Sequence, residues 1–382
     1  MTAKYNTIHF DNLKTRVTYS LFGERNRVTE FHAIIELTDY DSPAAEQFDK
    51  LNDSVLQLFS CPFLANVSIV WKRYFVSDAA NQFGFLQQTE NEAVSVVQQS
   101  PLNGSKAILW VYGVENVKME VMPDGAVIMK RPNYAHVFYT QLHEKTGSSF
   151  QQTTRVFEKY ITSLGNLHST LEANCIRTWL FIQNVDNQYA QMVEARKLLF
   201  DAENMTSNTH YIASTGIEGR YINPNVIVLM DAYAIPEIKK EQIIYLNGAS
   251  HLNPTHEYGV TFERGTIVQF GDRRHVFISG TASINNSGQA VHLLNIEMQI
   301  NRVLENISVL LQEANCEMDD IAYLIIYLRD IADYKTVESY IENKYPHIPK
   351  VIVLAPVCRP EWLIEMECMA VKFIKDSRFA CY

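Results

Sequence analysis

Two glutamates near the end of the chain are candidates for acid–base chemistry. Glu365 and Glu367 lie in the strand-like run 363–371. A strand turns successive side chains to opposite faces, so residues two positions apart share one face. A carboxyl group whose pKa is raised by burial, or by a neighbouring carboxylate, is suited to deliver a proton. The opposite face would carry only small or apolar side chains, those of Ile364, Met366, Cys368 and Ala370.

The elements that position these glutamates belong to an internal repeat. The sequences LEANC at 171–175 and EANC at 313–316 each end a helix-like segment. Strand-like runs follow at 176–185 and 321–328, and each run is followed by an Asp and a Tyr. Similarity at a fixed spacing indicates a fold that is built from copies of one unit.

Periodicity predicts the elements of three copies, at 1–115, 116–245 and 246–382. In the third copy we expect strands at 261–270, 274–280, 321–328, 350–357 and 363–371, and helices at 294–311 and 334–345. The second copy repeats this order, with strands at 119–121, 127–129, 136–139, 176–185, 210–214 and 226–234, and helices at 152–174 and 188–202. The first copy is weaker, with strands at 32–37, 67–75, 93–97 and 107–112, a helix at 41–59 and a poorly marked second helix.

The sequence therefore predicts an α/β (α+β) protein of three tandem ββαβαββ units. Each unit lays a helix across one face of a small sheet, and the other face must be buried elsewhere. We expect a pseudo-trimer with helices outside and sheets facing inward, either monomeric or a weak homo-oligomer. Glu365 and Glu367 would then lie in a groove between units, where small-ligand sites are common.

Comparison of the copies distinguishes the two glutamates. Aligning residues 230–234 with 366–370 sets Leu229 opposite Glu365 and Asp231 opposite Glu367. The second copy thus keeps an acid at one position and is apolar at the other, so we expect the third copy to be the active unit and the second copy to form a wall. Residues near the penultimate strand of the second copy could line that wall: Tyr211, Thr215 and Arg220.

Composition argues against several classes of function. The net charge is −10 with no basic run, which disfavours nucleic-acid binding, because phosphates are bound mainly by Lys and Arg. No apolar run approaches the roughly 20 residues that span a bilayer. The N-terminus lacks the apolar core of a signal peptide, and the six cysteines form no CxxC pair, so we expect reduced thiols in a cytoplasmic protein. The histidines form no metal-binding motif, and we expect no metal.

Several stretches carry a resemblance to a known family. The unit order, with YLRD at 327–330 followed by Asp333 and Tyr334, resembles the YjgF/Rid superfamily, whose endoribonuclease L-PSP-like members form trimers with ligand sites in the clefts. FISGTASI at 277–284 resembles the SGTASI segment of chorismatases, and CRPEWLIEME at 358–367 resembles their CRxxLLVEIE segment. The superfamily resemblance covers roughly the last 230 residues well and the first 120 poorly; the chorismatase resemblance rests mainly on the two segments.

Chorismatases hydrolyse the enolpyruvyl ether of chorismate and release pyruvate. The resemblance implies Glu365 as catalytic acid, Cys358 as an active-site thiol and Arg359 as a site or support residue. The segment TFERG at 261–265 is similar to the family's substrate-binding arginine segment, which would make Arg264 a carboxylate ligand with Gly265 beside it. Such a reaction needs a proton donor and cationic partners for a small carboxylate substrate, and no cofactor is implied.

Other interpretations stay open. After GTASI the chain continues with NNSG at 285–288 in place of the Gly-His-rich turn that the family usually has. Rid deaminases of enamines and imines carry an arginine where this chain has Lys350, which lacks the bidentate fork of Arg. A third possibility is a non-catalytic protein that binds small acids. Residue by residue, Glu365 could be a paired strand glutamate, Cys358 a buried thiol, and Arg359 a partner of Glu361 or Glu365.

Overall fold

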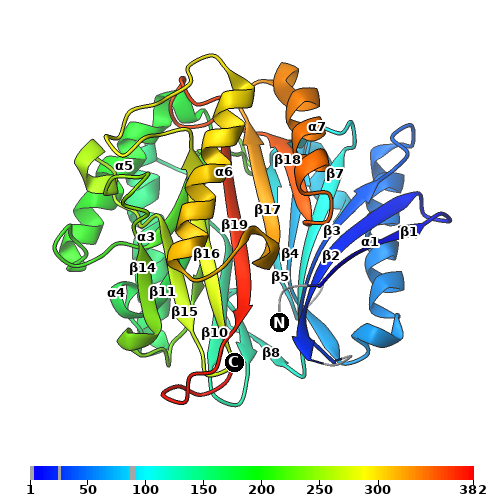
Figure 1. Cartoon of the computed structure of the whole chain (residues 1–382), viewed down its shortest axis with the longest axis horizontal. Helices are drawn as coiled ribbons and strands as arrows, with labels where there is room; N and C mark the ends of the chain where they lie inside the picture. Colours follow the sequence, from blue (N-terminus) through cyan, green and yellow to red (C-terminus); the bar gives the residue numbers. More distant parts are fainter. Residues whose placement is uncertain (1–3, 25–26, 87–90) are drawn as a thin grey trace.

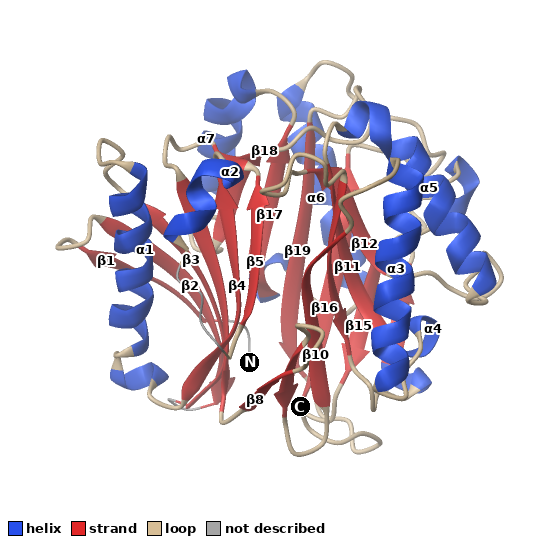
Figure 2. Ribbon diagram, turned by 180° about the vertical axis from the view of Figure 1, so that it is seen from behind, coloured by secondary structure: helices blue, strands red, loops and turns tan. Residues whose placement is uncertain are grey.

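The computed structural model describes residues 4–24, 27–86 and 91–382. Three β-sheets lie side by side in the centre of the molecule, and the long helices cover them from outside (Figure 1). The view from behind shows the same layers, with α1 on one flank and α3 and α5 on the other (Figure 2). The expected α/β architecture of three repeated units, with sheets inward and helices outward, is confirmed.

The first unit has the sheet order β1-β2-β3-β7-β4-β5. Strands β1 and β2 were not predicted, because β1 is largely exposed on both faces and shows no clean alternation. The poorly marked second helix is a single turn, capped by the Asp78 side chain. The elements are β1 (Lys4–Phe10), β2 (Thr15–Glu24), β3 (Arg27–Leu37), α1 (Ala44–Phe59), β4 (Val67–Val76), α2 (Ala79–Gln82), β5 (Ala93–Gln98) and β7 (Ala107–Glu115).

The second unit has the order β12-β11-β13-β10-β9-β8. The single helix predicted at 152–174 is two helices, because the chain turns after Asn166 and the Thr170 hydroxyl caps a new helical turn. The strand predicted at 210–214 begins at Ala213. The elements are β8 (Lys118–Val121), β9 (Val127–Lys130), β10 (Ala135–His143), α3 (Ser149–Asn166), α4 (Leu171–Asn174), β11 (Cys175–Ile182), α5 (Val185–Ala202), β12 (Ala213–Glu218) and β13 (Val228–Ala234).

The third unit has the order β14-β15-β16-β19-β17-β18, and β6 (Ser100–Pro101) from the first unit extends its edge. The strand predicted at 321–328 matches the structure, whereas the edge strand β14, which begins at Ile243, was not expected. The other elements are β14 (Ile243–Leu246), β15 (Gly265–Gln269), β16 (Arg273–Ala282), α6 (Ile296–Glu313), β17 (Ile321–Leu328), α7 (Tyr334–Lys344), β18 (Lys350–Leu354) and β19 (Ile364–Phe373).

A shared irregularity relates the three units residue by residue. Strands β4, β11 and β17 each shift register once against the last strand of their unit. The first residue pair after each shift is Trp71 with Tyr112, Arg177 with Tyr233, and Tyr323 with Met369. Tyr112, Tyr233 and Met369 are therefore equivalent positions of the three last strands. Counting back from these positions makes Trp110, Asp231 and Glu367 equivalent, and likewise Ile108, Leu229 and Glu365. This is the pairing of copies two and three that the sequence alignment proposed.

The three inner sheet faces meet in an aromatic core. Trp71 of the first unit packs edge-on against Trp179 of the second at 5.2 Å between ring centroids, and Trp110 lies 4.9 Å from Tyr323 of the third. Aromatic pairs in such arrangements contribute roughly 0.5–1.5 kcal/mol beyond the area that they bury. Part of the aromatic content of the sequence therefore lies between units, where it helps to hold the three sheets in one relative position.

A buried arginine–carboxylate pair crosses each interface between units. Arg73 binds Asp231 at 2.9 Å between the first and second units, and Arg177 binds Glu367 at 2.9 Å between the second and third. The third interface has Arg273 and Glu30 at 2.7 Å. Removing one partner of such a pair leaves an uncompensated buried charge, at a cost of about 3–5 kcal/mol.

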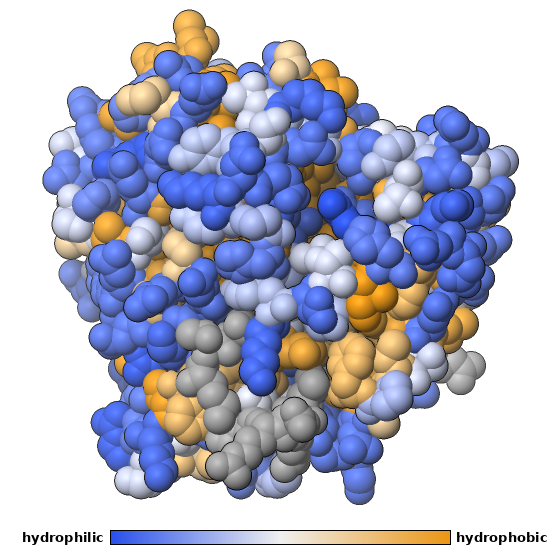
Figure 3. Space-filling model, turned by 45° about the vertical axis from the view of Figure 1, so that its right-hand side comes forward, coloured by the Kyte–Doolittle hydropathy of each residue, from blue (hydrophilic) through white to orange (hydrophobic). Residues whose placement is uncertain are grey.

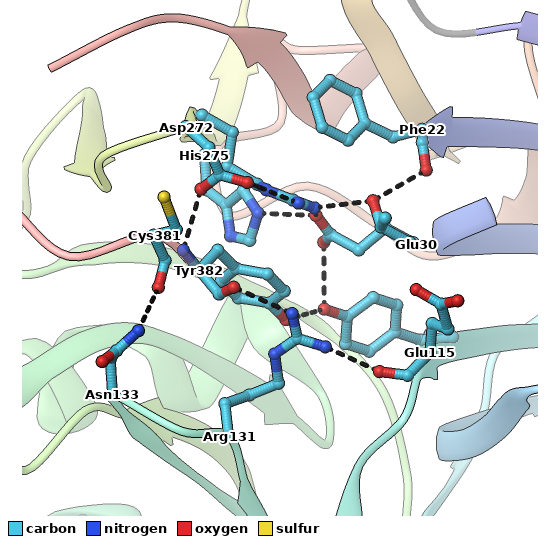
Figure 4. Close-up of polar contacts among 12 residues, drawn as sticks. Phe22, Glu30, Glu115, Arg131, Asn133, Asp272, His275, Cys381 and Tyr382 are labelled. Carbon is cyan, nitrogen blue, oxygen red and sulfur yellow. Dashed lines mark hydrogen bonds and ion pairs between the residues drawn. The ribbon is translucent and has the colours of Figure 1, made fainter. Parts of the chain in front are cut away.

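The pair at the third interface belongs to a larger polar cluster (Figure 4). Glu30 also accepts a hydrogen bond from the Tyr112 hydroxyl and contacts His275 Nε2 at 2.9 Å. Burial alone would raise the pKa of Glu30, but His275 and Arg273 hold it well below its usual range. The ring of Tyr382 packs against His275 at 4.8 Å, and Arg131 donates to the Tyr382 carbonyl at 2.8 Å.

The face in Figure 3 is largely hydrophilic, with hydrophobic side chains in smaller patches. Within the part of the chain that the structure describes, no helix is both long and apolar enough to cross a membrane. All six cysteines are free thiols. The described residues include no group of three His, Cys, Asp or Glu side chains arranged to hold a metal ion.

Candidate functional site

A cavity of about 330 Å³ lies between the second and third units. Helix α5 and strand β12 form one wall, and β16, the start of β19 and the segment before β15 form the other. The chemically relevant lining residues are Tyr189, Arg196, Ser214, Thr215, Tyr258, Arg264, Gly280, Cys358, Arg359, Trp362 and Glu365. The cavity is large enough for a small organic ligand.

Glu365 occupies the inner wall of this cavity. It lies in β19, pairs in register with Ala282 and Tyr327, and is 5% exposed. Burial, together with the neighbouring charge of Glu367, raises the pKa of Glu365 to about 8. The charges of Arg177 and Arg264 oppose this shift. No side chain or backbone N–H among the described residues donates a hydrogen bond to its carboxyl group. Glu365 is therefore a buried acid that keeps its proton at neutral pH.

A glycine makes room for this acid. Strand β16 shifts register against β19 between Ile278 and Thr281, and Gly280 lies in that bulge. A Cβ atom at Gly280 would collide with a carboxylate oxygen of Glu365. The backbone N–H of Gly280 donates to the Thr215 hydroxyl of β12 at 2.9 Å, which joins the two walls at this point. Close approach, rather than a turn, explains the glycine.

Glu367 has a different role from Glu365, although both lie on the same face of β19. Its carboxylate accepts hydrogen bonds from Arg177 Nη2 at 2.9 Å and from Trp179 Nε1 at 2.7 Å. The equivalent Asp231 of the second unit is engaged in the same way by an arginine, Arg73, at 2.9 Å. The acid at this position is a structural group in both units, and the acid that only the third unit has is the one that faces the cavity.

Two of the predicted arginines line the cavity without a carboxylate partner among the described residues. Arg264 donates to the Asn253 carbonyl from Nε at 3.2 Å and from Nη2 at 2.9 Å. Burial lowers its pKa, and its guanidinium lies 5.3 Å from the centre of the Tyr258 ring. The guanidinium of Arg359 lies 5.0 Å from the centre of the Tyr258 ring and 4.9 Å from the centre of the Trp362 ring. Both cations are therefore available to an anionic ligand.

Cys358 also lines the cavity, but as a neutral group. Burial, together with the nearby Glu365, raises the pKa of the Cys358 thiol to about 12. The thiolate is the nucleophilic form of cysteine, so a thiol with this pKa is unreactive at neutral pH. The side chain fills the wall next to Tyr189, whose own pKa burial raises well above its usual value.

Three of the predicted site residues lie elsewhere. The Tyr211 ring packs in the core of the second unit, 6.3 Å from Phe200. Arg220 is half exposed and lies 3.6 Å from Glu218, beyond the end of β12. Gly265 begins β15, where a Cβ atom would meet the Phe277 carbonyl oxygen at 2.9 Å, so it serves close strand pairing. Strand β12 begins at Ala213, three residues later than predicted, so Tyr211 precedes the strand. Thr215, which the sequence analysis also placed in the wall, does line the cavity, together with its neighbour Ser214.

The sequence interpretation missed Arg196, Tyr189 and Tyr258. Arg196 lies on α5 and is 1% exposed. A signal existed, because Met192, Arg196 and Phe200 follow one another at four-residue spacing and all are buried. An arginine within an otherwise apolar helical stripe is unusual and marks a position that needs an explanation.

Lys350 lies in a different cleft. It begins β18 and faces a cavity of about 150 Å³ between the third and first units. Its ammonium group donates to the Tyr345 carbonyl at 3.1 Å and pairs with Glu342 at 3.1 Å. Ile108, the equivalent of Glu365, faces this second cleft. The repeat relates the two clefts. The cleft that holds Lys350 has Ile108 at the position of Glu365, and its lysine is bound by Glu342 and by a backbone carbonyl.

Comparison with known proteins gives consistent results. The family model described as Endoribonuclease L-PSP matches residues 266–372. A RutC family protein of Saccharolobus solfataricus is 30% identical over 99 residues, which are 25% of this chain and 79% of that protein. A RutC family protein of Pyrococcus abyssi is 28% identical over 99 residues, 25% of this chain and 78% of the relative. The 3-aminoacrylate deaminase RutC of Acinetobacter baylyi is 28% identical over 97 residues, 25% of this chain and 77% of the relative.

A solved structure extends the similarity beyond the third unit. The crystal structure of a chorismatase superposes with a TM-score of 0.63 at 16% identity, and the match covers 79% of this chain and 93% of that one. At this identity the likeness concerns the fold. From the match of the third unit and the identity to a RutC relative over most of that relative's length, the chain belongs to the YjgF/Rid superfamily.

Proposed function

We propose that this protein is a hydrolase of the chorismatase type, which cleaves the enolpyruvyl ether of chorismate or of a related dicarboxylate and releases pyruvate. One observation carries the proposal. Glu365 is a buried acid that keeps its proton and accepts no hydrogen bond from the described residues, and its cavity also holds Arg264, which has no carboxylate partner among them. A carboxylic acid that keeps its proton at neutral pH is what protonation of an enol ether requires. The similarity to a chorismatase in fold, and the GTASI and CRPEWLIEME segments, support the same assignment.

The reaction follows from the arrangement of these groups. Glu365 transfers its proton to the methylene carbon of the enolpyruvyl group, and the electron pair of the carbon–carbon double bond forms the new C–H bond. The resulting oxocarbenium ion takes up water, which loses a proton to the Glu365 carboxylate. The hemiketal then breaks its bond to the ether oxygen of the ring substituent while its hydroxyl proton passes to that oxygen, giving pyruvate and the free alcohol. Glu365 keeps the proton that it took from water and is ready for the next cycle. Arg264 holds the carboxylate next to the reacting carbon.

Pyruvate release from chorismate tests this proposal, followed with a coupled dehydrogenase. We expect turnover by the wild type and a loss of at least about 100-fold in kcat with Glu365→Gln, because general acid catalysis contributes roughly 10²–10⁴. Glu305→Gln serves as the matched control, since Glu305 lies on the exposed side of α6. Absence of pyruvate release by the wild type would overturn the proposal.

A Rid-type deaminase that hydrolyses enamines or imines is the second candidate. It is favoured by the 28% identity over 97 residues to the 3-aminoacrylate deaminase RutC. The engagement of Lys350 by Glu342 and by backbone carbonyls speaks against it, because the cation at that position is not free to hold a substrate. Ammonia release from a freshly generated enamine would support this candidate. A protein that binds chorismate but turns over neither substrate would instead be a binder of small acids.

A further inference from the structure

The repeat relates the cation of the second cleft to a serine in the first. Lys350 pairs with Leu324 across β17 and β18, and Ser214 pairs with Thr178 across β11 and β12. Leu324 and Thr178 are each the second paired residue after the register shift of their strand, so they are equivalent. Ser214 is therefore the counterpart of Lys350. The strand position that holds a cation in one cleft therefore holds a hydroxyl in the cleft of Glu365.

A guanidinium from the neighbouring helix reaches the same place. Arg196 Nη1 lies 3.5 Å from the Ser214 hydroxyl, and Nε donates to the Thr261 hydroxyl at 3.1 Å. The third nitrogen, Nη2, is buried and has no hydrogen-bond acceptor within the described part of the chain. Among the described residues Arg196 also has no carboxylate within ion-pair distance. Helix α5 thus supplies to this cleft the cation that β12 lacks.

Arg196 is a buried cation with no carboxylate partner among the described residues. A buried guanidinium without a counter-ion is costly, and buried charges in folded proteins are normally paired. Burial lowers the pKa of Arg196, and the nearby Tyr189 opposes that shift. Burial also raises the pKa of Tyr189 well above its usual value, so this phenol is not a counter-ion at neutral pH. Because Arg196 lines the cavity, an anion bound there would pair with it and accept a hydrogen bond from Nη2.

We infer that Arg196 binds a carboxylate of the ligand at the wall of the cavity that faces Glu365. This inference rests on the proposed function for the identity of the ligand, but not for the presence of an anion site. Arg264 belongs to the wall that carries Glu365 and acts on Glu365 electrostatically, whereas Arg196 belongs to the facing wall. A ligand with two separated carboxylates would place one at Arg264, next to the reacting group, and the other at Arg196.

Ligand binding to catalytically silent protein tests the assignment. Chorismate, its ring-carboxamide analogue and benzoate are titrated by calorimetry into Glu365→Gln and into Glu365→Gln combined with Arg196→Met or Arg196→Lys. We expect Arg196→Met to weaken chorismate binding roughly 10- to 100-fold, the loss typical of a hydrogen bond between charged groups. Arg196→Lys should recover part of this affinity, because it keeps the charge and loses the planar fork. Lys197→Met, which removes an exposed cation from the same helix, should have no effect.

The analogue separates binding from a structural role. In protein with Arg196 the carboxamide should bind more weakly than chorismate, whereas after Arg196→Met the two should bind equally. An undiminished preference for chorismate after the substitution would overturn the inference. If Arg196→Met does not fold, Arg196→Lys and the carboxamide comparison still decide it. Failure of the wild type to release pyruvate, combined with Arg196-dependent binding of benzoate, would refute the proposed function and leave the anion site standing.

Discussion

Glu367 should set the pH range in which Glu365 works. The two side chains share one face of β19, and the charge of Glu367 raises the pKa of Glu365. Residues two positions apart on a strand are separated by about 6.6 Å. Two unit charges about 7 Å apart interact by about 2.4 kcal/mol at an effective dielectric constant near 20, which corresponds to about 1.7 pKa units. Arg177, at 2.9 Å from Glu367, cancels part of this field.

Arg177 is unchanged in Glu367→Gln, so the variant loses the whole contribution of Glu367, and we expect the pKa of Glu365 to fall by about 1.7 units. Because the protonated acid is the active form, kcat/KM falls as the pH rises through this pKa, and the variant should lose activity about 1.7 pH units earlier than the wild type. The measurement is the pH dependence of kcat/KM for pyruvate release from pH 6 to 10.

Asp231→Asn is the matched control for this experiment. It removes the same acid from the equivalent position of the second unit and breaks the buried pair with Arg73. Leu229 takes the place of Glu365 there, so no catalytic acid is affected. Both variants should lose stability, by about 3–5 kcal/mol each, but only Glu367→Gln should move the pH profile. A profile that stays in place in Glu367→Gln, or that moves equally in Asp231→Asn, would refute the electrostatic coupling.

Three further outcomes follow from the site. The pKa of Glu365 is about 8 in the folded chain against an ordinary 4.5, so the wild type loses stability as the pH rises from about 4.5 to about 8. The melting temperature of Glu365→Gln relative to the wild type should therefore increase over that range in thermal-shift scans, and a constant difference would contradict the buried acid. Gly280→Ala should displace Glu365 and lower kcat at least about 10-fold with chorismate affinity less affected, since small misplacements of catalytic groups are costly. Cys358→Ser should keep most of the activity, because the thiol is protonated; a loss as large as that of Glu365→Gln would show that the thiol reacts.

Local pattern was enough where a segment's structure depends on its own residues. The run at 321–328 is apolar throughout and forms a strand with those bounds. Period two put Glu365 and Glu367 on one face, and the structure agrees. The second copy supplied a comparison inside the same chain, which identified Glu365 as the acid without a structural counterpart. Strand β1 was not predicted because it is largely exposed on both faces and shows no clean alternation.

What the sequence by itself determined is the repeated α/β unit, the face of β19 that bears the acids, and the absence of an acid at the equivalent position of the second copy. Only the tertiary structure decided which groups share the cavity. Arg196 and Glu365 are 169 positions apart in the numbering, and nothing in their own neighbourhoods relates α5 of one unit to β19 of the next. Nearness along the chain suggested Tyr211, Thr215 and Arg220 as wall residues, yet of these only Thr215 lines the cavity, beside Ser214. Glu365 keeps its proton, and Arg196 is a buried charge, because the second and third units enclose one cavity between them. The contacts that bring these units together join segments that are far apart in the sequence, and local periodicity does not predict such contacts.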